Sequence, residues 1–120
     1  MTLQEKLKWF GSGLAAICSK TYHYTRGKNA AAPFAVWAED SEADSFEADS
    51  RKAEQMISGS ISYYTNKEFD PVCDDIQTFL NRSAAYWYLY AVNYEPETGL
   101  IHFEWRWDVD ANKATGQGTG

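Results

Sequence analysis

Residues 100–109 read LIHFEWRWDV, and the strict alternation in this stretch decides the fold. Successive side chains of an extended chain point to opposite faces. One set is apolar and consists of Ile101, Phe103, Trp105 and Trp107. The other set is polar and consists of His102, Glu104, Arg106 and Asp108. The stretch therefore predicts a β-strand with one buried face and one solvated face.

The preceding residues, YWYLYAVNY at 86–94, predict the partner of this strand. The segment EPETG at 95–99 is typical of a turn, so we expect an antiparallel hairpin. Because residues 86–94 are apolar on both faces, we expect this strand to be central in the sheet or covered on both sides. We hypothesise that a neighbouring subunit supplies whatever cover the domain lacks.

Three further stretches predict strands. TYHYT at 21–25 is short and rich in β-prone residues, and PFAVWAE at 33–39 is a second candidate. EQMISGSISYYT at 54–65 alternates between apolar side chains and serines, with Gly59 as a weak point. These stretches supply the rest of a sheet of about four to five strands.

Two segments predict helices. The first has Thr2 as a candidate N-cap, and Gly11 and Gly13 predict a kink or close packing within it. Its apolar stripe is Leu3, Leu7, Phe10, Leu14 and Ile17. The second begins at Asp70–Pro71, an N-cap acid before a proline, and ends near residues 81–83. Its stripe is Val72, Ile76, Phe79 and Leu80.

The predicted order is helix, strand, strand, strand, helix, strand, strand. This order is typical of an α+β domain in which two helices pack on one face of a mainly antiparallel sheet. We expect residues 1–110 to form this single domain and residues 111–120, ANKATGQGTG, to form a flexible tail.

Composition excludes several classes of function. The net charge of −6 disfavours a general nucleic-acid binder and binding to anionic membranes. The N-terminus is a poor signal peptide, and no apolar run is long enough to span a membrane. Cys18 and Cys73 are far apart, fall on predicted apolar helix faces and are expected to be reduced core thiols.

The acidic stretch EDSEADSFEADSRKAEQ at 39–55 resembles a calcium-binding loop in its first positions only. A start at Asp40 places acids at the first, third and fifth positions, but Ser45 and Arg51 occupy those that require Gly and Glu. We therefore interpret the stretch as a long connection between two strands, with Phe46 as an apolar anchor. Loops of this length in compact domains tend to be functional.

The sequence offers little enzymatic chemistry. His102 near Glu104 and His23 between two tyrosines allow acid–base work, but a surface contact is the simpler interpretation because no nucleophile motif accompanies them. The two Cys and two His lack zinc-ligand spacing. The many aromatic residues allow stacking on sugars or single strands, but packing and protein contact are more common uses. We expect no cofactor and no metal.

Three segments carry a resemblance: YHYTRGKNAAAPFAVWAEDSEADSFEADSRKAEQ, YYTNKEFDPVCDDIQTFL and VNYEPETGLIHFEWRWDV. From residue 22 to residue 109 the chain resembles a small protein encoded among the head–tail genes of long-tailed phages and prophages of Gram-positive bacteria, the tail-completion or tail-terminator group. The resemblance implies a small α+β fold and a structural, non-enzymatic role.

Further expectations follow from the resemblance. It implies a virion protein, assembled in the host cytoplasm, that forms a ring, commonly a hexamer, capping the tail tube and facing the neck. DNA passes its lumen without specific binding. Another neck component or a minor tail component is the alternative, and a small hydrolase or sugar-binding domain using His23, His102 or Glu104 is a remote one. We expect the protein contacts to involve Arg26, Lys28, Glu39, Asp40, Glu42, Asp44, Phe46, Asp49, Arg51, Lys52, Glu95 and Glu97.

Overall fold

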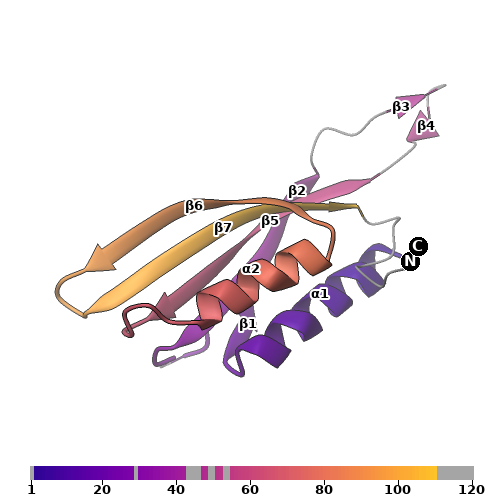
Figure 1. Ribbon diagram of the computed structural model, residues 1–120. Coiled ribbons are helices and arrows are strands. Elements are labelled where there is room, and N and C mark those ends of the chain that lie inside the picture. Colours follow the sequence, from indigo (N-terminus) through magenta and orange to yellow (C-terminus); the bar gives the residue numbers. More distant parts are fainter. Residues whose placement is uncertain (1, 29, 43–46, 49–50, 53–54, 111–120) are drawn as a thin grey trace.

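A computed structural model describes residues 2–28, 30–42, 47–48, 51–52 and 55–110 of the chain. Within these ranges the fold is α+β: two helices lie on one side of a five-stranded, mainly antiparallel sheet (Figure 1). The expected C-terminal tail, together with Asp44, Phe46 and Asp49, lies outside the described residues. The predicted fold class and order of elements are confirmed for the sheet and its helices.

The sheet has the order β1-β2-β5-β7-β6. Its strands are β1 (Thr21–His23), β2 (Phe34–Glu42), β5 (Met56–Thr65), β6 (Tyr86–Glu95) and β7 (Leu100–Asp110). Neighbours pair antiparallel, except that β1 runs parallel to β2. The long strand β5 is therefore central, and β1 and β6 form the two edges.

The core lies between the sheet and the helices, and β7 contributes its largest members. Trp105 and Trp107 are each 1% exposed, whereas the polar residues that alternate with them along the strand lie on the other face. The predicted alternation of β7 is confirmed there. Gly59 of β5 is a close-approach position, because a Cβ atom there would come within 2.4 Å of the Trp107 ring.

Helix α1 (Leu3–Ile17) begins at the predicted cap. The Thr2 hydroxyl accepts from the Glu5 backbone N–H, and the Glu5 carboxylate accepts from the Thr2 N–H, which forms a capping box. Gly11 lies against the Trp37 ring and Gly13 against the Phe79 ring. The two glycines therefore allow close packing within an unbroken helix.

Helix α2 (Val72–Arg82) starts one residue later than predicted, with Pro71 rather than Asp70 at the N-cap position. Pro71 has helical dihedral angles, and the Asp70 carboxylate accepts from the Val72 backbone N–H at 2.9 Å. The same carboxylate accepts from the hydroxyls of Tyr63 and Thr65, each at 2.7 Å. Asp70 thus ties the start of α2 to the end of β5.

The expectation that residues 86–94 form a central strand is wrong, whereas the hypothesis that a neighbouring subunit covers the strand stays a prediction. This segment is β6, an edge strand, and nearly all of its side chains are at least partly open to solvent. The reason is geometric: the β6–β7 hairpin extends past the end of the helix layer (Figure 1). Of its large apolar residues, only Trp87 packs against the core, and the others lack cover within the described part of the chain.

The acidic stretch is also shorter as a connection than predicted. Strand β2 continues through Glu42, so Glu39, Asp40 and Glu42 belong to a sheet strand. Two short strands, β3 (Glu47–Ala48) and β4 (Arg51–Lys52), then pair antiparallel beyond the ends of β2 and β5 (Figure 1). Propensity alone does not predict them, because their residues are mostly charged.

Candidate interaction surface

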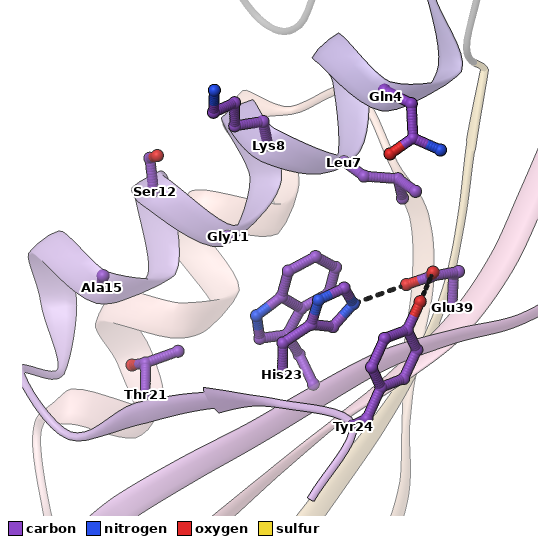
Figure 2. Close-up of a pocket in the computed structure, with 11 residues that line it drawn as sticks. Gln4, Leu7, Lys8, Gly11, Ser12, Ala15, Thr21, His23, Tyr24 and Glu39 are labelled. Atoms are coloured by element: carbon purple, nitrogen blue, oxygen red, sulfur yellow. Dashed lines mark hydrogen bonds and ion pairs between the residues drawn. The ribbon is translucent and has the colours of Figure 1, made fainter.

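A groove runs between α1 and the β1 edge of the sheet. It has a volume of about 620 Å³ and is lined on the helix side by Gln4, Lys8, Gly11, Ser12 and Ala15 (Figure 2). On the sheet side it is lined by Thr21, His23, Tyr24, Trp37 and Glu39. Small side chains on the helix leave the outer edge of β1 accessible from this side.

His23 is clamped between aromatic rings in this groove. Its imidazole stacks on Trp37 and on Tyr24, with ring centroids 3.8 Å apart in both cases. Its Nε2 lies 2.8 Å from a carboxylate oxygen of Glu39, and the Tyr24 hydroxyl donates to the other oxygen (Figure 2). These contacts fix the residues that follow β1 in one arrangement.

The charge of Glu39 is stabilised by these neighbours. Burial alone would raise its pKa, but the hydrogen bonds from Tyr24 and His23 outweigh burial and lower it. The hydrogen bond to Glu39 in turn raises the pKa of the Tyr24 phenol. Glu39 therefore acts here as an ionised acceptor that orders His23 and Tyr24.

A row of rings crosses the opposite, helix-free face of the sheet. Phe34 stacks on Tyr64 at 4.7 Å and Tyr64 on His102 at 4.2 Å, and the Arg26 guanidinium lies 5.7 Å from the Phe34 ring centroid. Burial lowers the pKa of His102. Arg26 thus covers the Phe34 end of the row, and Lys28, two residues later in the chain, is exposed.

An ion pair lies farther along the same face. Arg106 of β7 contacts Asp40 of β2 at 2.9 Å, across the intervening strand β5. The hydrogen bond to Asp40 raises the pKa of Arg106. Asp40, predicted as a contact residue, is therefore engaged within the domain.

The β6 edge is the largest exposed apolar feature among the described residues. Four tyrosines dominate it and are 58% to 74% exposed, and Leu89 and Val92 are 43% and 50% exposed. The tyrosines are Tyr86, Tyr88, Tyr90 and Tyr94. The register shifts between Leu89 and Ala91, which marks a bulge in the strand. Exposed apolar patches of this kind mark interaction sites.

The turn after β6 carries negative charge. Glu95 and Glu97 are exposed, and the backbone N–H groups of Thr98 and Gly99 both donate to the Glu95 carbonyl. Gly99 has a φ of 73°, which glycine adopts without strain. The predicted turn is confirmed, and it presents two carboxylates at the tip of the hairpin.

The structure brings together only some of the predicted residues. Glu39 joins His23 in the groove, whereas His102 and Glu104 lie on the opposite face of the sheet. The grouping required by the hydrolase or sugar-binding alternative is therefore not formed. Of the other predicted contact residues, Arg51 and Lys52 lie in β4, away from the groove.

Sequence reasoning missed the groove, although the small residues Gly11, Ser12 and Ala15 on one side of the first helix were an available signal. It also missed the pairing of His23 with Glu39, because a contact between residues in adjacent parallel strands leaves no local pattern.

No group of three or more His, Cys, Asp or Glu side chains in the described ranges is arranged to hold a metal ion. Neither helix in that part of the chain has the length and apolarity that crossing a bilayer requires. No protein-family model matches the chain, and no curated protein matches it significantly.

Proposed function

We propose that this protein is a ring-forming structural component of the head–tail junction of a long-tailed phage, a tail terminator that caps the tail tube and joins it to the neck. The sequence resemblance suggests this role. The observation that best supports it is the β6 edge. Strand β6 carries exposed aromatic side chains, and no described strand pairs with its outer edge. Such an edge favours pairing with another chain.

The proposed mechanism is assembly by burial of apolar surface. Tyrosine side chains provide large contact area at low entropic cost, as at many interfaces. Head-to-tail contacts between identical subunits close into a ring when the rotation between neighbours permits. In this role the protein would belong to the virion, contact itself, the tail-tube protein and a neck protein, and carry out no catalysis.

The net charge of −6 suits a lumen that DNA crosses. Like charges on the wall and the DNA would repel each other and so prevent adhesion. The hexamer expected from the resemblance remains part of the proposal.

The test combines mass and binding. Light scattering and negative-stain images of the purified protein should show closed rings, and the protein should co-sediment with purified tail tubes. In its absence, tails should have uncontrolled length and heads should remain unjoined. Leaky heads with tails of normal length would instead favour the alternative, a neck component. A chain that stays monomeric and does not bind tubes would contradict the proposal.

A further inference from the structure

The two edges of the sheet, which no other described strand covers, differ in a way that suits contact between copies. The β6 edge is ten residues long and presents large apolar side chains, whereas the β1 edge is three residues long and adjoins the groove beneath α1. A head-to-tail assembly needs two different surfaces on every copy. Building on the proposed ring, we infer that the β6 edge of one copy pairs with the β1 edge of the next copy.

Strand direction supports this joint. Strand β6 is antiparallel to β7, β7 to β5, and β5 to β2, while β1 is parallel to β2. Strands β1 and β6 of one sheet therefore run in opposite directions. When the sheet of the next copy continues in the same orientation, the new pair is antiparallel, which is the slightly more stable arrangement per residue.

Side-chain size is complementary across the joint. Leu89 and Val92 of β6 pair with Trp105 and Phe103 and so point to the helix side of the sheet. In a continued sheet, side chains on that side enter the groove of the next copy. The helix wall of that groove consists of Gly11, Ser12 and Ala15, among others, and leaves room for them.

The register of the sheet places Leu89 of β6 and His23 of β1 in the same row of paired residues. His23 pairs with Trp37, Trp37 with Ile61, Ile61 with Trp105, and Trp105 with Leu89. Leu89 and His23 therefore occupy the same row of the sheet. With no shift between copies, Leu89 of one copy meets the groove beside His23 of the next.

Charge is complementary at one end of the joint. Strand β6 ends at Glu95, and Glu97 lies in the following turn. The same end of the β1 edge carries Lys20, directly before the strand, and Arg26, above the Phe34 ring. Opposite charges at the rim of an interface fix its register and speed association.

The test uses two variants, each of which blocks one side of the joint. Leu89→Lys places a charge on the β6 edge, and Ala15→Arg fills the groove from an exposed helix position. Each variant alone should self-associate at least about 30-fold more weakly than wild type, the effect of losing one central contact residue. Far-UV circular dichroism and the thermal midpoint check that each folds, and Ser12→Arg replaces Ala15→Arg if it does not.

Mixing the two variants gives the decisive measurement. The intact β6 edge of Ala15→Arg can still pair with the intact groove of Leu89→Lys, and the resulting pair cannot grow. Light scattering should therefore show a one-to-one complex of twice the 13.6 kDa chain mass, with no larger species. A symmetric contact between two β6 edges predicts instead that Ala15→Arg associates alone and that mixing adds nothing.

Several results would overturn this inference. One is that either variant alone self-associates as strongly as wild type. Another is that the mixture of the two variants remains monomeric. A third is that the wild-type chain remains monomeric at millimolar concentration. The proposed function is tested separately, and it is contradicted if the wild-type protein does not bind tail tubes. Rings that form from both variants and still bind tubes would refute the joint and leave the function standing.

Discussion

Replacement of Asp70 by alanine should destabilise the protein by about 3–4 kcal/mol. The substitution removes three hydrogen bonds at 2.7 to 2.9 Å, from the Tyr63 hydroxyl, the Thr65 hydroxyl and the Val72 backbone N–H. A hydrogen bond to a charged group contributes about 1.5–3 kcal/mol, and loss of a helix cap costs about 1 kcal/mol. Tyr63 and Thr65 are each 1% exposed, so water reaches their hydroxyls poorly and the loss of their acceptor is costly. Because the three bonds share one acceptor, their sum is an upper limit.

The assay is urea unfolding followed by tryptophan fluorescence, with Asp74→Ala as the matched control. Asp74 is an exposed acid in the same helical turn, so its removal should cost at most about 0.5 kcal/mol. A cost below about 1 kcal/mol for Asp70→Ala would refute the reasoning, since the buried hydroxyls would then have other partners. In thermal unfolding the expected loss corresponds to a fall in Tm of roughly 12 °C or more.

The pH dependence supplies an independent check of the same site. Burial tends to raise the pKa of Asp70, but the hydrogen bonds from Tyr63, Val72 and Thr65 outweigh burial and lower it below its ordinary value. A carboxyl with a lowered folded-state pKa contributes stability that is present above about pH 4 and is lost as the pH falls through the folded-state value. Wild type should therefore lose more stability on acidification than Asp70→Ala does.

Three further outcomes are expected. Gly59→Ala should cost about 3 kcal/mol or more in urea unfolding, because the added methyl group would collide with Trp107 and the neighbouring strand. Burial raises the pKa of the Cys73 thiol to about 12, so alkylation at pH 8 should be at least about 100-fold slower in the folded protein than in urea. Equal rates would contradict this environment. Gln77→Leu should cost about 1–2 kcal/mol, because the buried Trp105 indole N–H, now 3.0 Å from the Gln77 oxygen, would lose its acceptor.

Local pattern was enough to predict most of the fold. The alternation in β5 and β7, the Thr2 cap and the Asp70–Pro71 start depend on residues within one or a few turns of chain, and all appear in the structure, with the second helix starting one residue later than predicted. The same reasoning could not give the parallel pairing of β1 with β2. That pairing depends on how residues 24–33 return the chain, which no short-range signal specifies.

The interaction surface was harder to predict. The pattern of apolar and polar residues shows which side chains tend to be buried, but it does not show which element or subunit buries them. The apolar residues of β6 were correctly recognised, but their position in the interior of the sheet was wrong. Likewise, the charged residue Asp40 suggested a loop, whereas its ion pair with Arg106 allows it to lie in a strand. Both the edge position of β6 and the strand position of the acidic residue depend on contacts with residues that are distant in the sequence.

The β6 edge also argues for closure of the proposed assembly. Natural edge strands are commonly short, charged or covered, because an open edge invites uncontrolled pairing. Strand β6 has ten residues, of which only the last, Glu95, is charged, and its main irregularity is the bulge after Leu89. Head-to-tail pairing covers one β6 edge and one β1 edge at each joint, yet a linear chain of subunits always leaves one β6 edge free at its end. A closed ring covers every β6 edge, so the same apolar strand that makes the monomer prone to association favours an assembly of fixed size.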